Sequence, residues 1–175
     1  MKKSRKANRS NNGKNKQYED PGRILTAIEE IDNAIQLQSD MKIVLDTIIS
    51  KARDLFECDR AWLFYPCNPD IDFFEVAFES TTPDYPGAKA LSEKVPMTRD
   101  MADYCVRALS KVGEPDIDPP TGQVMTNDIA LRFKVKSLMF MALRPQIGDV
   151  WMFGLHQCDH DRIWTHNEKQ LFRVI

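Results

Sequence analysis

The sequence predicts an α+β fold, in which an antiparallel sheet carries helices on both of its faces. Three observations indicate this class. Two amphipathic helical segments come first. Two pairs of short apolar runs follow, each with the pattern of a hairpin, and further helical segments separate and follow these pairs. Two long stretches rich in proline connect the elements, and loops longer than about 12–15 residues usually serve as lids or binding elements.

The composition indicates one globular domain. The chain has 175 residues, of which 42% are hydrophobic and 29% are charged. These values exclude a collagen-like or wholly disordered chain. No run approaches the roughly 18 apolar residues of a membrane span, and the basic N-terminus lacks the apolar core of a signal peptide. The sequence therefore predicts a cytoplasmic protein without a membrane span in this segment.

Charge divides the chain into two parts. Residues 1–21 hold seven Lys or Arg against Glu19 and Asp20, whereas the remainder carries a net charge of −7. Residues 1–21 are predicted to be a disordered basic tail, because they offer little apolar area to bury. A polyanion-binding arm is the less favoured alternative. Residues 22–175 are predicted to be the folded domain, whose acidic character argues against nucleic acid as a partner.

The first helical segment begins near Gly22. Its isoleucines at positions 24, 28, 31 and 35 form a heptad-type seam. This seam fits a helix packed on its own domain and, equally, a helix paired with its twin in a homodimer. A second helix, capped by Ser39-Asp40, is expected to run to about Phe56.

The rest of the chain alternates strands and helices. Strands are predicted at 61–65 and 73–78 and again at 136–143 and 150–157, each pair forming a hairpin. Helices are predicted from about Met97 to Leu109, at 129–133, and from Thr165 or Asn167 to the end. Residues 80–97 and 113–122 are expected to be loops. The last helix has no C-cap, which suggests a truncated closing helix and a longer parent protein.

Several segments, taken in order, resemble a GAF domain over residues 23–175, and most closely the GAF domains of phytochromes and cyanobacteriochromes in bacterial sensor kinases. The segments that carry the resemblance are Cys58-Asp59-Arg60-Ala61-Trp62-Leu63-Phe64-Tyr65, Glu75-Val76-Ala77-Phe78-Glu79-Ser80, Val124-Met125-Thr126-Asn127-Asp128-Ile129, Arg132-Phe133-Lys134-Val135-Lys136-Ser137-Leu138, and His156-Gln157-Cys158 with Trp164 and Glu168.

The resemblance implies a small-molecule pocket between one sheet face and residues 98–133. Because side chains alternate along a strand, Met139 and Met141 share one face of their strand, and His156 and Met152 share one face of theirs. This alternation leaves open which face of the sheet forms the pocket. The place of His156 in the family favours its own face. The candidate ligand-binding residues are Asp128, Phe133, Lys136, Met139, His156, Tyr104 and Phe78.

Two departures from the family limit the ligand. The Cys-His pair that attaches a linear tetrapyrrole is absent before Arg132-Phe133, and Lys136 stands near the position of an arginine that pairs with a propionate. A covalent bilin is therefore not expected. The cyclic-nucleotide signature of other GAF domains is also absent. An unknown small molecule remains the expected ligand.

Metal and thiol chemistry are weighed as alternatives. His156, Cys158, His160 and His166 lie close in sequence, but their spacing fits no standard zinc site, so no metal is expected. Cys67, in a Pro-Cys-Asn-Pro loop, could be an exposed thiol, but no second cysteine is near it in sequence. No catalytic residue is assigned.

These observations predict a ligand-sensing regulatory module of a bacterial signalling protein. A ligand in the pocket would shift the arrangement of the terminal helices, and this shift would act on an output domain of the parent chain. A homodimer is expected to form through the same terminal helices. The alternatives are a thiol-dependent free methionine sulfoxide reductase on the same scaffold, and a dimerisation spacer whose pocket is filled.

Overall fold

The computed structural model describes residues 20–92, 94–120 and 123–175. The predicted basic tail lies outside the described residues up to position 19. Asp20 already belongs to the fold, because its carboxylate accepts a hydrogen bond from the backbone of Gly22 and caps the first helix.

One antiparallel sheet organises the molecule, which confirms the predicted α+β class. Its strands run in the order β3-β1-β7-β6-β5. A separate two-stranded ribbon pairs β2 with β4. The strands are β1 (Arg60–Phe64), β2 (Phe73–Phe74), β3 (Val76–Thr81), β4 (Val95–Pro96), β5 (Asp116–Asp118), β6 (Ser137–Leu143) and β7 (Trp151–Gln157).

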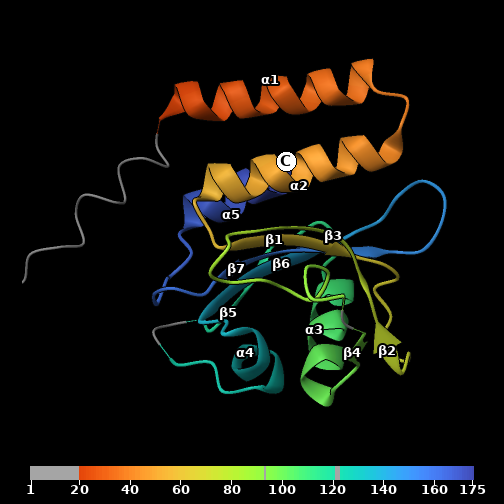
Figure 1. The fold of residues 1–175 in the computed structure, drawn as a ribbon, viewed down its shortest axis with the longest axis vertical. Helices are drawn as coiled ribbons and strands as arrows, with labels where there is room; N and C mark the ends of the chain where they lie inside the picture. Colours follow the sequence, from red (N-terminus) through yellow and green to blue (C-terminus); the bar gives the residue numbers. More distant parts are fainter. Residues whose placement is uncertain (1–19, 93, 121–122) are drawn as a thin grey trace, which may run out of the picture.

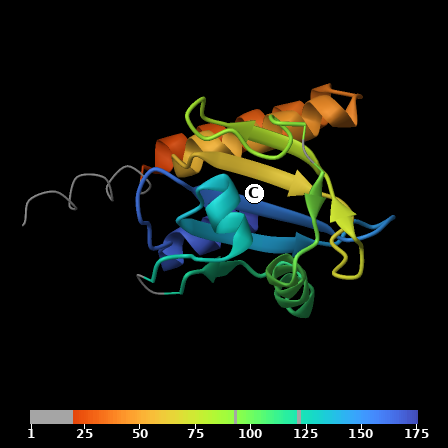
Figure 2. The same ribbon diagram turned by 60° about the horizontal axis from the view of Figure 1, so that its bottom comes forward.

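Helices cover both faces of this sheet (Figures 1 and 2). On one face lie α2 (Met41–Phe56) and α5 (His166–Val174), and α1 (Pro21–Leu37) packs on the outer side of α2. On the other face lie α3 (Arg99–Ser110) and the short α4 (Asp128–Phe133). Among the described residues, no helix is long and apolar enough to cross a bilayer.

Side-chain caps fix where the helices begin. Asp40, Thr98 and Asn127 each accept a hydrogen bond from a backbone N–H in the first turn of the helix that follows. The closing helix begins after Thr165 rather than Asn167, because Thr165 and Glu168 form a reciprocal capping box.

The isoleucine seam of α1 serves mainly internal packing. Ile31 is buried together with Ala27, and Ile24 and Ile28 are half-buried, in a helix that stacks on α2. Ile35, at the end of the seam, is 54% exposed. The seam therefore supports the packing of a helix on its own domain.

The strands differ from the predicted ones at three places. Residues 113–122, expected to be a loop, contain β5, which pairs with the edge of β6. The expected strand 73–78 is divided into β2 and β3, and β4 lies within the expected loop 80–97. These strands are only two or three residues long, apart from β3, and their pairing is with partners distant in sequence, so local periodicity carries little signal of them.

The sheet separates two hydrophobic cores. Because side chains alternate along a strand, Ala61 and Leu63 face α2 and α5, whereas Trp62 and Phe64 face α3 and α4. Each core is covered by its own helices. Because β1 contributes side chains to both cores, a displacement of β1 on the side of α3 and α4 also affects the side chains that pack against α2 and α5.

Candidate functional site

A cavity lies between the sheet, helices α3 and α4, and the loop that follows β3. Its empty space is about 470 Å³, which includes its mouth to solvent. The lining residues are Arg60, Trp62, Phe64, Phe74, Val76, Glu79, Ala88, Met101, Tyr104, Ile129, Phe133, Leu138, Met152 and His156.

Strand register assembles the floor of the cavity. Trp62 of β1 lies opposite Gly154 of β7, and Arg60 lies opposite His156. A Cβ at position 154 would lie 2.1 Å from the indole ring, so only glycine leaves room for Trp62 there. The indole stacks on Phe64, with ring centroids 5.8 Å apart.

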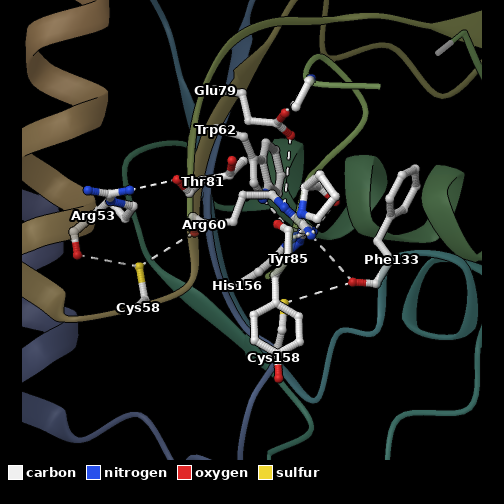
Figure 3. A network of polar contacts seen from close by, with 12 residues as sticks. Arg53, Cys58, Arg60, Trp62, Glu79, Thr81, Tyr85, Phe133, His156 and Cys158 are labelled. Atoms are coloured by element: carbon white, nitrogen blue, oxygen red, sulfur yellow. Dashed lines mark hydrogen bonds and ion pairs between the residues drawn. The ribbon is translucent and has the colours of Figure 1, made fainter. Parts of the chain in front are cut away.

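Arg60 is the polar centre of the site, although it is only 2% exposed (Figure 3). Its Nη2 donates to the carbonyl oxygens of Tyr85 and Pro86, both at 3.0 Å, and more distantly to that of Phe133 at 3.4 Å. Its guanidinium also lies 5.7 Å from the centre of the Phe133 ring. One side chain thus ties β1 to the loop above it and to the end of α4.

Both ring nitrogens of His156 lie close to N–H groups of β1 side chains. Arg60 Nη1 lies 2.9 Å from Nδ1, and Trp62 Nε1 lies 3.0 Å from Nε2. Burial, reinforced by the charge of Arg60, holds the pKa of His156 well below its ordinary value of 6.5. The imidazole is therefore neutral at physiological pH.

Glu79 of β3 supplies the negative charge near Arg60. Its Oε1 lies 4.0 Å from Arg60 Nε, and its Oε2 accepts a hydrogen bond from the backbone of Ala90 at 3.0 Å. Burial raises the pKa of this carboxyl, and the Ala90 N–H and the Arg60 charge oppose that effect.

Tyr104 joins the helical wall to the sheet edge. Its hydroxyl donates to Asp118 of β5 at 2.6 Å and accepts from Asn127, the cap of α4, at the same distance. Burial and the bond to the Asp118 carboxylate raise the pKa of Tyr104. The arrangement fixes α3, β5 and α4 relative to one another.

Three of the predicted ligand-binding residues line the cavity. Tyr104, Phe133 and His156 are all among its walls. The structure thus brings together residues from α3, α4 and β7, on the sheet face that the place of His156 favoured. Ligand binding by these three residues stays a prediction.

Two predicted residues lie at the surface instead. Asp128 is exposed at the first position of α4, where an acidic side chain suits the positive end of the helix dipole. Lys136 is exposed, and its Nζ donates to the carbonyl oxygen of Asp159 at 2.7 Å. Neither residue is among the walls of the cavity, and ligand binding by them stays a prediction.

Met139 and Phe78 lie on the opposite sheet face. Leu138, not Met139, lies opposite His156, so alternation directs Met139 toward the core beneath α2 and α5. Phe78 lies opposite Leu63 and packs in the same core. These two side chains therefore pack in the core on the far side of the sheet from the cavity, and ligand binding by them stays a prediction.

Sequence reasoning missed Arg60, Trp62, Glu79 and Leu138 as cavity residues. For Leu138 a signal was available, because the predicted hairpin of 136–143 and 150–157 makes it a neighbour of His156. Trp62 lies on a strand that the sequence pairs with another segment, and its place beside β7 is evident only in the structure. Arg60 and Glu79 were quoted only as part of a motif. A buried charged pair on adjacent strands is evident only after β1 and β3 are aligned.

The cysteines lie away from the cavity walls. All four are buried and reduced, including Cys67, for which the sequence also allowed an exposed position. The thiols of Cys67 and Cys105 are hydrogen-bonded, which lowers the pKa of Cys67 and raises that of Cys105. Burial raises the pKa of Cys58 to about 12 and that of Cys158 to about 11.

No metal-binding cluster is found in the described part of the chain, since no three His, Cys, Asp or Glu residues there are placed to hold an ion. His156 of the predicted histidine and cysteine group instead belongs to the cavity floor.

Comparison with known proteins identifies the fold. No family model and no curated protein match the sequence. Among solved structures, the phycocyanobilin-bound GAF domain of a cyanobacterial phytochrome aligns with a TM-score of 0.67 at 17% identity, covering 86% of this chain and 87% of that one. The phycoerythrobilin-bound GAF domain of a cyanobacterial phytochrome gives 0.64 at 17% identity, covering 87% and 90%.

A third similar structure has a different biological setting. The GAF domain of a phosphoenolpyruvate-protein phosphotransferase from Coxiella burnetii aligns with a TM-score of 0.60 at 10% identity, covering 89% of each chain. The chain therefore has the GAF fold, as the order of its sequence motifs predicted.

Proposed function

We propose that this chain is a ligand-sensing GAF module of a cytoplasmic bacterial signalling protein. A small molecule occupies the cavity, and its presence is relayed through the terminal helices to an output domain of the parent chain. The observation that carries the proposal is the cavity itself, which has apolar walls and a few convergent polar groups.

The position of the cavity supports the relay. Trp62 on the cavity floor and Leu63 in the opposite core are neighbours on β1, and Leu63 shares that core with Phe56 of α2 and Phe172 of α5. A ligand that moves β1 therefore alters the surface on which these helices rest. Relay requires that the ligand bind two helix arrangements with different affinity.

We do not propose a thioether-linked bilin for this cavity, although two of the similar structures hold bilins. No cysteine is among the described residues that line it, so the walls offer no thiol for attachment. The proposed ligand is a molecule held without a covalent bond.

Native mass spectrometry of the freshly purified chain tests the proposal. A small molecule should co-purify, and its mass should be lost from Ala88→Leu, which fills part of the cavity. Leu131→Ala, at an exposed position of α4, is the matched control and should retain it.

Hydrogen exchange in α2 and α5 should change when the molecule is removed. If exchange in these helices is indifferent to occupancy, the relay does not exist.

A thiol reductase remains the enzymatic alternative, favoured by one observation. The fold brings Cys105 next to Cys67, although the two are distant in sequence. Both thiols are buried, however, at 5% and 0% exposure, which opposes direct attack on a substrate. Thiol titration of the native chain discriminates, because a catalytic cysteine must react without unfolding. The cavity itself argues against the third alternative, a spacer with a filled pocket.

A further inference from the structure

We infer that the cavity takes a small, largely apolar molecule bearing a carboxylate, and that this carboxylate lies against Arg60, Trp62 and His156. The inference rests on the proposed sensing function and names the chemical class of the ligand for that cavity. It arises from an excess of hydrogen-bond donors on the cavity floor, which Figure 3 shows from close by.

The first surplus donor arises at His156. Its two ring nitrogens face Trp62 Nε1 and Arg60 Nη1, at 3.0 and 2.9 Å. An indole and a guanidinium can only donate, whereas a neutral imidazole has one N–H and one acceptor nitrogen. Only one of the two contacts can therefore be a hydrogen bond. In the other, two N–H groups point at each other.

Protonation of His156 does not relieve this conflict. A charged imidazole has N–H groups on both nitrogens, so it would face two donors with two donors. The neutral ring is therefore the better of two incomplete states, and an added acceptor is what the site lacks.

The second surplus donor is Arg60 Nε. It is buried and has no hydrogen-bond partner among the described residues. The nearest anion, Glu79 Oε1, lies 4.0 Å away, beyond hydrogen-bond distance. A buried donor without an acceptor is costly, because it has lost its bonds to water. Two separate side chains of the cavity lining thus carry N–H groups that no acceptor matches.

A carboxylate satisfies this arrangement best. Its two oxygens accept hydrogen bonds from several directions, and a guanidinium binds it in a planar fork. A phosphate dianion fits less well, because Arg60 is the only cationic residue among the described residues of the lining, and Glu79 already opposes its charge. The rest of the ligand should be apolar, since it would contact Phe64, Met101 and Met152.

Titration calorimetry on the 175-residue chain tests the inference with matched probes. Phenylacetate carries the carboxylate, and phenylacetamide has the same shape without the charge. We expect phenylacetate to bind about tenfold more tightly, the usual gain of a charge-assisted hydrogen bond over a neutral one. Glu79→Gln should tighten phenylacetate binding further, because it removes the competing charge.

Two tryptophan variants separate the donor from its surroundings. Trp62→Phe keeps an aromatic ring on the cavity floor but removes the N–H, and should weaken phenylacetate binding several-fold with little effect on phenylacetamide. Trp164→Phe is the matched control. Trp164 Nε1 is also buried without a hydrogen-bond partner, but it lies in the opposite core and should not matter to binding.

Imidazole ¹⁵N resonances provide a readout at the atoms concerned, because the His156 pair should shift when phenylacetate binds and not when phenylacetamide does. Equal affinity for the two probes, no binding of phenylacetate, or equal effects of the two tryptophan variants would overturn the inference. A neutral molecule found by native mass spectrometry would leave the sensing function standing and remove only the carboxylate.

Discussion

Single residues fix the shape of the cavity floor. Gly154 leaves room for Trp62, whose indole then reaches His156 and stacks on Phe64. Protein interiors are so closely packed that the addition of even one methyl group can lower the stability of the fold. The shape of the cavity floor therefore depends on the lack of a side chain at Gly154.

We predict that Gly154→Ala destabilises the fold by about 1–3 kcal/mol, because the new methyl group would overlap the Trp62 ring. Urea unfolding, followed by circular dichroism, measures the loss. In a Trp62→Leu background the same alanine should cost clearly less, since the ring that it meets is gone. An equal cost in both backgrounds would show that the contact is not responsible.

His156 should make stability depend on pH. Burial and the charge of Arg60 hold its pKa well below 6.5 in the folded state, so below about pH 6.5 the unfolded chain binds the proton more readily. The free energy of unfolding should therefore fall as the pH decreases from 6.5, by up to about 1.4 kcal/mol per pH unit.

Unfolding of His156→Gln at pH 7.5 and 5.5 tests this contribution by comparison with the original chain. The variant should lose less stability between the two pH values. His166→Gln, which removes an exposed imidazole at the start of α5, is the control and should behave like the original. The prediction is wrong if both variants show the same slope.

At the scale of elements, short segments hold the wall of the cavity in place. β5 has only three residues, yet both of its aspartates bind α3: Arg107 Nε lies 2.9 Å from Asp116 Oδ2, and Tyr104 donates to Asp118. The cap of α4 binds the same tyrosine hydroxyl. The helical wall is thereby joined to the sheet edge through one phenol.

We predict that Tyr104→Phe lowers the free energy of unfolding by about 1–2 kcal/mol, because the partly buried Asp118 and Asn127 both lose a partner. Chemical denaturation gives the value. The control is Tyr65→Phe, whose exposed hydroxyl lies 3.3 Å from Asp149 and should contribute less than about 0.5 kcal/mol. Equal losses would show that the Tyr104 network adds nothing to the fold.

The sequence predicted the long elements well and the short ones poorly. Helix caps such as Asn127 and alternation in β6 and β7 are local signals, so they are legible along the chain. β5 is held by pairing with a strand some twenty residues away, and no local pattern marks it. Lys136 illustrates the same limit at the site, since one residue before β6 it turns to the surface carbonyl of Asp159.

At the scale of the whole molecule, the outermost helix leaves apolar side chains uncovered. Leu25 is 58% exposed and Ile35 is 54% exposed, although α1 covers α2 with its inner face. Such positions suit the proposed pairing of two copies through their terminal helices, because the second copy would cover these apolar side chains.

We predict that the chain forms dimers in sedimentation velocity experiments and that Ile35→Glu shifts it toward monomers. A buried unpaired charge at an interface costs enough to reverse a weak association. Thr26→Glu, at another exposed position of the same helix, is the control. If the original chain sediments as a monomer at high concentration, α1 serves only to cover α2.

The alternation of side chains across the sheet also matters to protein engineers. Positions 62, 64, 138 and 152 contact the cavity, whereas positions 61, 63, 139 and 141 contact the helix-side core. A library that randomises the first group and conserves the second would vary ligand selectivity while retaining the core on which α2 and α5 pack. Biosensors for new analytes could therefore be sought on this scaffold without redesigning its output.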